Sequence, residues 1–546
     1  MSTTTEPTTA AAPGPEQARN AGVIREYQVW LPGWVKALPE WVRVGTVLVA
    51  LMAASTAIHA AYVGGQFWMD EAITVGISSH PLTAIPNILR FDGSPPLFYL
   101  LLHIWMSWVG NGQAATHWLS MIFAAATVPA GYWAGRSLGG KRAGLISATF
   151  FAFNAFLDYY SLETRMYSLT TLIGIFATLA LIRGWVYRER RYVIIFGISE
   201  ALMLYTHNWA LFFGAAAFLT MVIVYFIGGE QVRENYIRDT IGTFVGAAVL
   251  FAPWVPNFIF QVTHTAAPWD LEPGFGAPIQ IAVGVFGGAS ISVIMVLAAG
   301  IGYARLVARP RRMTREAQVA IALVALPVLT LLVGWLASHV ITPAWDVRYF
   351  APIVGSMILV LAIGTARAGI IGAIAVVFVI GFMARPSAFE PAYKSDMQDI
   401  GGEMGPLLRP GDLVIVGQPE QTPLAYYYLP GGLRYANTMG PVADPSYMDW
   451  VNAMARYRAE NVNRTASALI NSVKPGQQLL YIRPLTEGEQ NWRAPWTKEI
   501  RLRSAQYGAI IARYVREGRL VEESWAPHNY RGSCCIADSA VLYKKV

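Results

Sequence analysis

The chain has 546 residues, of which 54% are hydrophobic and only 14% are charged, and it contains 18 tryptophans. Its mean hydropathy is +0.39. This composition is too apolar for a soluble globular protein and predicts a polytopic membrane protein. The two cysteines, Cys534 and Cys535, are neighbours in the sequence, which excludes a disulfide scaffold and the spacing of a cysteine zinc site.

The first residues are rich in Thr, Ala, Pro and Glu and read MSTTTEPTTAAAPGPEQ. They lack the basic start and apolar core of a secretory signal, so residues 1–40 are predicted to be a disordered tail. A criterion of about 20 apolar residues then predicts eleven membrane-spanning helices between residues 41 and 385. The predicted spans are Trp41–Tyr62, His117–Trp133, Ala143–Leu157, Met166–Leu181, Val193–Tyr205, Trp209–Ile227, Ile237–Phe260, Ile279–Ala304, Ala317–His339, Ala351–Thr365 and Ile370–Ala384.

A further apolar segment, Pro95–Gly110, has only sixteen residues and begins with two prolines. The basic residues of the loops indicate how it lies. If it rests on the outer surface of the membrane, the loops on the side of the tail carry fifteen Arg and Lys residues, and the opposite loops of the membrane region carry three. By the positive-inside rule the tail is then cytoplasmic, and the segment is an amphipathic interfacial helix, consistent with Trp105 and Trp108.

The formal net charge is +7, and the pI is about 9.2. Most of the basic residues belong to the predicted cytoplasmic loops and are separated by membrane spans. They therefore form no continuous groove or recognition helix, and nucleic-acid binding is not expected.

From about Arg385 onward no run is long enough to span a membrane, and charged residues return at an ordinary density. Apolar runs at 412–417 (DLVIVG), 479–484 (LLYIRP) and 540–546 (AVLYKKV) accompany a helical pattern at 499–518. This alternation predicts a small α/β domain over residues 386–546, which the number of spans places on the extracytoplasmic side. It contains no GxGxxG, P-loop, GxSxG or HExxH pattern, so no nucleotide site or hydrolytic centre is assigned to it.

The remaining polar residues gather in the predicted outer loops of the membrane region. A carboxylate there could accept a proton from an acceptor hydroxyl, and arginines could neutralise the phosphate of a lipid whose tail stays in the bilayer. The candidates are Asp70, Glu71 and Asp92 in the first outer loop, Asp158, Glu163 and Arg165 in the second, His207 in the third, and Asp346, Arg348 and Tyr349 in the last.

Each candidate also has a structural interpretation. The acidic pair could belong to a solvated loop, and the two arginines could extend to lipid headgroups. His207 could cap a helix. Glu200, inside a predicted span, is interpreted as a protonated or paired residue of the helix bundle, with a place in the cavity lining as the alternative.

Six motifs follow one another along the membrane region: WMDEA, DGSPPLFYLLLHIW, GRSLGGKRAGL, YSLETRMYSL, YTHNWALF and RYFAPI. Together they resemble the membrane-embedded GT-C glycosyltransferases, in the branch that includes the protein O-mannosyltransferases and the lipid A aminoarabinose transferase. The resemblance covers residues 41–385 and implies a GT-C fold for this region, as a transmembrane catalytic domain.

The resemblance implies transfer of one sugar, with inversion, from a polyprenyl-phosphate carrier to an acceptor on the outer face. Asp70 matches the proposed general base of the family, and Glu71 would hold its loop or share its proton network. Arg165 and Arg348 match positions that would bind the departing phosphate, since guanidinium groups make charge-assisted contacts to its oxygens. Tyr349 would line the same cavity.

The resemblance also raises the question of a metal. His207 resembles an imidazole that binds a divalent cation or the phosphate in this branch, and Glu163 resembles the acidic position of the second loop, which also contains Asp158. Many relatives have a histidine or a carboxylate directly before the proline, whereas this chain has Ser94, a poor metal ligand. A cation bound by His207 and Glu163 is therefore one alternative, and a site without metal is the other.

The predicted function is a hexosyl- or pentosyltransferase of the inner (plasma) membrane, with mannose and arabinose as the first candidate sugars. Its acceptor would be a cell-envelope glycan, a glycolipid or a protein. The alternative is a transporter or lipid flippase with an extracytoplasmic binding domain, and a third interpretation is a scaffold for a cell-wall partner. Transport usually places ionisable residues near the bilayer centre in repeated halves, whereas here they gather on one face.

Overall fold

The first 36 residues and several loops lie outside the part of the chain that is described. A computed structural model of the whole chain describes residues 37–229, 233–265, 268–307, 314–383, 393–486, 492–527 and 537–546. The predicted tail up to residue 36, the basic residues at 308–313 and the pair Cys534 and Cys535 are outside these ranges. Residues 51–546 form one compact unit, to which all contacts given below belong.

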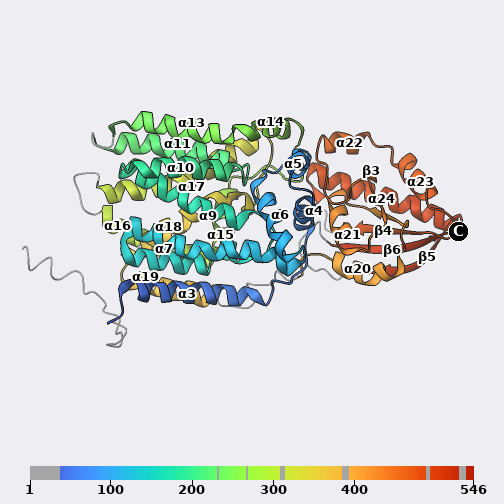
Figure 1. Cartoon of the computed structure of the whole chain (residues 1–546), viewed down its shortest axis with the longest axis horizontal. Coiled ribbons are helices and arrows are strands. Elements are labelled where there is room, and N and C mark those ends of the chain that lie inside the picture. The colour runs from blue at the N-terminus through green and yellow to red at the C-terminus, as the bar shows by residue number, and fades with distance from the viewer. Residues whose placement is uncertain are drawn as a thin grey trace, which may run out of the picture. The chain divides into compact units, whose positions relative to one another are not determined.

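The region from residue 40 to residue 383 is almost entirely helical (Figure 1). Its helices are α3 (Glu40–Ala60), α4 (Met69–Ser78), α5 (Ile85–Asp92), α6 (Leu97–Val109), α7 (Gln113–Ala152), α8 (Ala155–Tyr160), α9 (Tyr167–Leu181), α10 (Arg190–Leu204), α11 (Ala210–Ile227), α13 (Tyr236–Phe251), α14 (Val255–His264), α15 (Ala277–Val285), α16 (Ala289–Val307), α17 (Arg315–Val340), α18 (Ala351–Arg367) and α19 (Ile370–Met383).

Within the described residues, six helical segments are long and apolar enough to cross a membrane, and the pair α15 and α16, bent by 89°, makes a seventh if it counts as one span. The predicted number of eleven is thus not confirmed, although every predicted span coincides with a helix. The spans predicted at 117–133 and 143–157 both fall on α7, whose halves meet at Gly140 with φ of 85°. α10 and α19 have only 15 and 14 residues.

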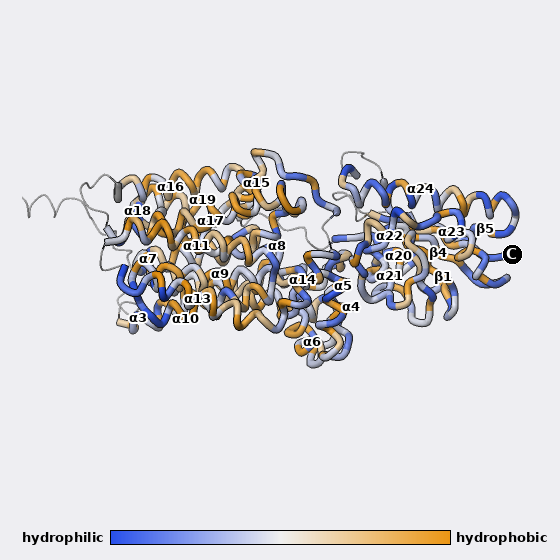
Figure 2. Tube along the Cα trace, turned by 90° about the horizontal axis from the view of Figure 1, so that it is seen from above, coloured by the Kyte–Doolittle hydropathy of each residue, from blue (hydrophilic) through white to orange (hydrophobic). Residues whose placement is uncertain are grey.

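Apolar side chains cover the outward faces of these helices, and the hydropathy of the helical region contrasts with that of the sheet region (Figure 2). Phe226 is 71% exposed, Val249 65% and Val377 69%. In contrast, α9 and α18 are mostly buried among the other helices. Aliphatic surfaces of this extent require a lipid environment, so the chain is a multi-pass membrane protein. Helix α6 is shorter than a span and exposes Trp108, as expected for the predicted interfacial helix.

Residues 393–546, called the sheet region here, contain a six-stranded mixed sheet in the order β3-β2-β1-β4-β6-β5. The strands are β1 (Leu413–Val416), β2 (Arg434–Asn437), β3 (Gly440–Val442), β4 (Gln478–Pro484), β5 (Leu520–Ala526) and β6 (Asp538–Lys545). The helices are α20 (Met397–Met404), α21 (Thr422–Tyr428), α22 (Ala453–Ala459), α23 (Val462–Asn471) and α24 (Pro495–Arg516). The predicted strands at 412–417, 479–484 and 540–546 and the predicted helix at 499–518 are all present.

The parallel strands β1, β2 and β4 form the centre of the sheet. Because side chains alternate along a strand, Leu413 and Ile415 of β1 pack on one face against Ile470 of α23 and Ile511 of α24. Helices cover both faces, so the central strand β1 is apolar throughout, as is usual for parallel sheets.

The sheet region contacts the short helices that follow α3. The Oγ of Ser395 donates to the carbonyl oxygen of Phe67 (2.9 Å), and the N–H of Phe67 donates to the Tyr428 hydroxyl (2.8 Å). Gly76 of α4 lies so close to the backbone of Ser446 that a Cβ atom at this position would overlap the Ser446 carbonyl. These contacts fix α4, which carries Asp70 and Glu71, against the sheet region.

Candidate functional site

Helix α4 directs its two acidic residues into different surroundings. The chain is extended at Trp68 and becomes helical at Met69, so Asp70 and Glu71 both lie in the first turn, where carboxylates interact favourably with the helix dipole. Consecutive helical residues point about 100° apart. As a result the Asp70 side chain is 23% exposed, whereas that of Glu71 is completely buried.

Two arginines from distant segments meet Asp70. The Nη1 of Arg348 lies 3.0 Å from Asp70 Oδ2, and the Nη2 of Arg165 lies 3.9 Å from the same oxygen. Arg348 belongs to a short 3-10 helix, Val347–Phe350, that lies directly before α18. Asp346, at the N-terminal end of this short helix, accepts a hydrogen bond from the Arg348 N–H (3.2 Å). The structure therefore brings together Asp70, Arg165 and Arg348 from three different predicted outer loops.

Arg165 is held by further contacts. Its Nη1 donates to the hydroxyl of Thr74 (2.8 Å) and lies 3.4 Å from the hydroxyl of Tyr99. The Tyr99 hydroxyl in turn lies 3.5 Å from Asp92. Burial raises the pKa of the Asp92 carboxyl, although Ser94 and Arg165 oppose this effect. Asp92 thus lies at the edge of the same group of polar side chains.

Aromatic side chains surround the two arginines. The guanidinium of Arg348 lies over the rings of Trp68 (5.1 Å) and Tyr349 (5.5 Å), and that of Arg165 lies over Tyr167 (5.7 Å). Such cation–π contacts favour a guanidinium that has little access to water. The predicted place of Tyr349 beside Arg348 agrees with this arrangement.

His207 lies between Tyr167 and Tyr349, with ring centroids 6.0 and 5.8 Å away. Its Nδ1 accepts a hydrogen bond from the N–H of Trp209 (3.1 Å). Burial, together with the nearby charges of Arg165 and Arg348, lowers the pKa of His207 to about 3. The imidazole is therefore neutral at physiological pH and contributes no charge to the site.

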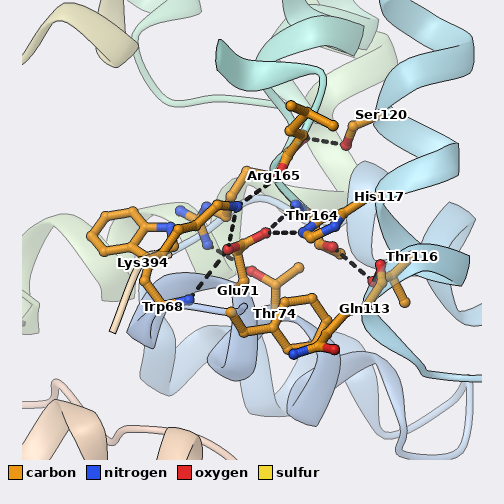
Figure 3. A network of polar contacts seen from close by, with 12 residues as sticks. Trp68, Glu71, Thr74, Gln113, Thr116, His117, Ser120, Thr164, Arg165 and Lys394 are labelled. Atoms are coloured by element: carbon orange, nitrogen blue, oxygen red, sulfur yellow. Dashed lines mark hydrogen bonds and ion pairs between the residues drawn. The ribbon is translucent and has the colours of Figure 1, made fainter. Parts of the chain in front are cut away.

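Glu71 is the centre of a buried network that connects four segments (Figure 3). Its Oε2 accepts from Lys394 Nζ (2.8 Å) and from the N–H of Trp68 (3.2 Å). Its Oε1 accepts from the N–H of Thr164 (2.8 Å) and lies 2.7 Å from His117 Nε2. Burial by itself raises the pKa of Glu71, but Lys394 and His117 outweigh it and lower the pKa to about 2.

His117 connects Glu71 to the chain that follows α3. Its Nδ1 lies 2.7 Å from the carbonyl oxygen of Val63, while its Nε2 faces the Glu71 carboxylate. Both of these neighbours are hydrogen-bond acceptors. Through the two oxygens of Glu71 the network links α4 to the segments that carry His117, Thr164 and Lys394.

Glu163 differs from Glu71, because its carboxyl is buried without hydrogen-bond partners among the described residues and its pKa is raised rather than lowered. Its side chain is 1% exposed, and neither carboxylate oxygen has a hydrogen-bond partner among the described residues. Burial raises the pKa of Glu163 to about 8, even though Lys394 and Arg348 favour its charged form. The carboxyl is therefore largely protonated at neutral pH, close to Asp70 and Arg348.

The residues present do not form a divalent cation site. Over the described ranges, no group of three His, Cys, Asp or Glu side chains is placed to hold a metal ion. His207 and Glu163, the predicted ligands, lie near the cationic side chains of Arg348 and, for Glu163, Lys394. Positive charges at this distance oppose the binding of a second cation.

Asp158 does not join this site in any contact of the structure. It lies in α8, with its Oδ1 at 3.4 Å from His59 Nε2, and both side chains are almost completely buried. Burial raises the pKa of the Asp158 carboxyl well above its usual range. The structure thus pairs this acidic residue of the second outer loop with His59 of α3, whereas Glu163 of the same loop lies close to Arg348.

Three residues that the sequence interpretation did not place in the site belong to it or support it: Trp68, His117 and Lys394. Trp68 stands in the same motif as Asp70 and Glu71, and this neighbourhood is a sequence signal that could have placed it in the site. His117 was assigned to the first position of a membrane span. Lys394 is 323 residues from Glu71 in the sequence, and no local pattern connects the two.

Comparison with known proteins bears on the fold. The model of the family described as dolichyl-phosphate-mannose-protein mannosyltransferase matches residues 93–260. At the level of sequence, no curated protein matches the chain. Among solved structures, ArnT from Cupriavidus metallidurans in the apo state is similar with a TM-score of 0.61 and 11% identity, over 92% of this chain and 98% of that chain.

Two other solved structures are also similar to the chain. ArnT from the same organism bound to undecaprenyl phosphate has a TM-score of 0.60 and 11% identity, over 92% of this chain and 98% of that one. The arabinofuranosyltransferase AftD from Mycobacteria has a TM-score of 0.52 and 14% identity, over 91% of this chain and 41% of that one.

The chain has the fold of the GT-C membrane glycosyltransferases, which is the fold expected from the six motifs.

Proposed function

We propose that the protein transfers one sugar from a polyprenyl-phosphate carrier to an acceptor of the cell envelope. The observation that carries this proposal is the partly exposed Asp70 carboxylate paired with Arg348 and Arg165 in otherwise buried surroundings. One carboxylate and two guanidinium groups suit a reaction that needs a base at the acceptor hydroxyl and cations at a leaving phosphate. The bound undecaprenyl phosphate named for ArnT supports a lipid phosphate as the ligand.

In the proposed step, the acceptor hydroxyl oxygen attacks the anomeric carbon of the donor sugar. The bond between that carbon and the phosphate oxygen breaks, and its electron pair leaves with the phosphate. Asp70 takes the proton of the hydroxyl. The phosphate changes from a singly charged diester to a monoester that can carry two negative charges, and Arg165 and Arg348 stabilise this increase. Attack from the face opposite the phosphate inverts the anomeric configuration.

The ion pairs of the ligand-free site suggest how the base becomes available. A carboxylate paired with two guanidinium groups has its oxygens occupied and is not free to contact an acceptor hydroxyl. A lipid phosphate would compete with Asp70 for the bidentate donors of Arg348 and Arg165, because phosphate oxygens suit the same planar group. Donor binding would thereby release Asp70 for the acceptor, so the base becomes free only when a donor is present.

The proposal also includes the sugar, the acceptor, the orientation in the membrane and the division of the chain into domains. The sugar is a hexose or a pentose, with mannose and arabinose as first candidates. The acceptor is an envelope glycan, a glycolipid or a protein on the outer face of the inner membrane, with residues 393–546 on that side and the tail in the cytoplasm. Residues 1–40, 41–385 and 386–546 would be a tail, a catalytic region and an outer domain. Transport is not favoured, because the ionisable residues gather on one face.

The experiment measures release of polyprenyl phosphate. Purified protein in sealed proteoliposomes receives a polyprenyl-phosphate sugar that carries a radiolabel in the sugar, together with an envelope extract as acceptor. Transfer moves the label into the acceptor and leaves one polyprenyl phosphate for each sugar transferred. A flippase would move the intact donor between leaflets without cleaving it, so an unchanged donor pool with altered sidedness would refute the proposal.

A further inference from the structure

We propose that the acceptor side of this site is a subsite for an uncharged sugar, with Trp269 as the platform for the sugar ring and Glu420 as a hydrogen-bonding partner of its hydroxyl groups. The inference rests on the proposed function, because it assigns the acceptor half of the same site. It commits to a chemical class of acceptor, namely a carbohydrate without carboxylate or phosphate at the reacting end.

Trp269 is the accessible end of a row of aromatic rings. Its Nε1 donates to the hydroxyl of Tyr349 (3.2 Å), the residue after Arg348. Its ring centroid lies 4.7 Å from that of Trp450, and Trp496 follows at 5.0 Å. Trp450 is 8% exposed and Trp496 is completely buried, whereas Trp269 is partly exposed. A ring supported from behind in this way is a rigid surface beside the site.

The backbone around Trp269 is fixed to the sheet region. The N–H of Trp496 donates to the carbonyl oxygen of Pro268 (3.0 Å), and the N–H of Asn452 donates to that of His264 (2.8 Å). The chain directly before Trp269 is thus held at two points by the sheet region. This arrangement gives the sheet region a direct role in positioning one wall of the site.

Glu420 extends this wall from the end of β1. Its Oε1 accepts from Trp496 Nε1 (3.0 Å) and from Gln418 Nε2 (3.0 Å), while its Oε2 has no hydrogen-bond partner among the described residues. Gln418, whose Nε2 donates to Glu420, also lies 3.8 Å from the Sδ of Met69, the residue before Asp70. A buried carboxyl oxygen without a partner suits a ligand hydroxyl.

Two indole N–H groups, those of Trp68 and Trp345, are also buried without a partner in the described part of the chain. Trp68 lies under the guanidinium of Arg348, and the backbone N–H of Trp345 donates to Asp270 (3.2 Å). A sugar offers hydroxyl oxygens as acceptors for these donors and a flat C–H face for an aromatic ring. A purely apolar ligand would leave the indole donors and the carboxyl unsatisfied.

The distribution of charge argues against an anionic acceptor. Arg165 and Arg348 are the cations proposed for the donor phosphate. Carboxyls lie around them as well: Asp346 Oδ2 is 3.5 Å from Arg348 Nε, Asp270 accepts from the N–H of Trp345, and Glu420 follows β1. A carboxylate or phosphate on the acceptor would meet these groups and would also compete with the donor for the two arginines.

The test compares the binding of uncharged and acidic trisaccharides of equal length. Full-length protein in detergent is titrated with α-mannotriose, arabinotriose and trigalacturonate, and binding is followed by saturation-transfer NMR. We expect at least one uncharged trisaccharide to bind and trigalacturonate to bind at least several-fold more weakly. Trp269→Ala and Glu420→Gln should each weaken this binding roughly three- to tenfold, the range expected for one ring contact or hydrogen bond.

Controls separate this inference from the proposed function. Trp269→Phe keeps a ring and should restore most of the binding, which excludes a folding defect as the cause. Trp525→Ala removes an indole that is 54% exposed on β5 and should change nothing. Binding of polyprenyl phosphate should be equal in the wild type and in all of these variants.

The inference is overturned if trigalacturonate binds as well as the uncharged trisaccharides, if none of the three binds, or if Trp269→Ala leaves binding unchanged. A wild-type protein that does not bind polyprenyl phosphate would instead contradict the proposed function, whatever sugars it binds.

Discussion

Asp70 and Glu71 are adjacent in the chain, yet only one of them can change partners during a reaction. Glu71 is completely buried and has four hydrogen-bonding partners, among them Lys394 and His117. Asp70 is partly exposed, and its partners are two arginines that suit a phosphate equally well. A general base must exchange hydrogen-bond partners within each turnover. The surroundings of the two carboxylates therefore favour Asp70 over Glu71 as the proposed base, although both side chains end in the same group.

Replacing Asp70 with Asn should abolish transfer and leave donor binding intact. The amide keeps the volume and hydrogen-bonding capacity of the side chain but cannot accept a proton at neutral pH. We therefore expect the chemical step to slow by roughly 10²–10⁴-fold. Single-turnover transfer from labelled donor measures this step, and donor affinity serves as the control. Transfer within a few-fold of the wild type would assign the base to another group, with Glu163 the first candidate.

The arginines should affect kcat more than the donor KM. Arg165→Ala and Arg348→Ala remove hydrogen bonds to a phosphate whose charge increases as the bond breaks, so the transition state loses more than the bound donor does. Lysine should restore less activity at a bidentate contact, because an ammonium is a point charge. Steady-state kinetics with varied donor provides the measurement. Normal turnover in both Ala variants would place the phosphate elsewhere, and failure of Arg348→Ala alone would return Arg165 to the role of an interface anchor.

Glu163→Gln should change the dependence of stability on pH. The pKa of Glu163 is raised from 4.5 to about 8 in the folded chain. Between these values the unfolded chain has lost the proton that the folded chain keeps, so this carboxyl makes the folded state less stable as pH rises from about 4.5 to 8. The variant removes that penalty. Thermal unfolding should show it to be more stable than the wild type at pH 8, with the difference shrinking toward pH 4.5, and a constant difference across this range would refute the raised pKa.

At the scale of residues, the sequence predicted where the site lies better than it predicted what each acidic residue contacts there. The motifs brought Asp70, Arg165 and Arg348 into one predicted site, and the structure places them together. The burial of Glu71 could not be inferred, because it depends on Lys394, which is 323 residues away. Asp158 had the same appearance as Glu163 in the second loop, and only its contact with His59 distinguishes it.

At the scale of elements, apolar runs predicted the existence of helices but not their geometry. Residues 113–152 read as two spans because their apolar runs are separated by Gly139–Arg142, whereas the structure has two helical halves that meet at Gly140. The glycine-rich turn between α15 and α16 bends what reads as one long span by 89°. Hydropathy records composition along the chain, and backbone bends at glycines are invisible to it.

The orientation of the helices is open to a direct test. The distribution of basic residues predicts that Arg188, Arg233 and Arg312 face the cytoplasm and that Asp70, His207 and the sheet region face outward. Single cysteines at positions 233, 312 and the exposed position 474 are introduced into a variant that lacks Cys534 and Cys535. In intact cells an impermeant thiol reagent should label position 474 alone. Labelling at 312 without labelling at 474 would invert the topology.

At the scale of the whole molecule, the link between Glu71 and Lys394 should decide whether the sheet region stays attached to the membrane helices. Lys394→Ala leaves a buried carboxylate with one cation fewer and should destabilise the fold by about 3–5 kcal/mol. Thermal unfolding in detergent, with limited proteolysis near residue 385, measures the effect. Lys474→Ala, at an exposed position of the sheet region, is the matched control. An unchanged unfolding temperature for Lys394→Ala would show that the other contacts suffice.

The same link has a consequence for biosynthesis. The ribosome completes Glu71 long before Lys394, and at roughly 5–20 residues per second the 323 intervening residues take on the order of 15–65 s. During this interval the Glu71 carboxylate lacks the ammonium of Lys394. The helix that carries the proposed base, Asp70, therefore gains this contact only after nearly three quarters of the chain has been made. Chains that terminate early should for this reason be inactive, and cells would be protected from the wasteful donor cleavage that an incomplete enzyme could cause.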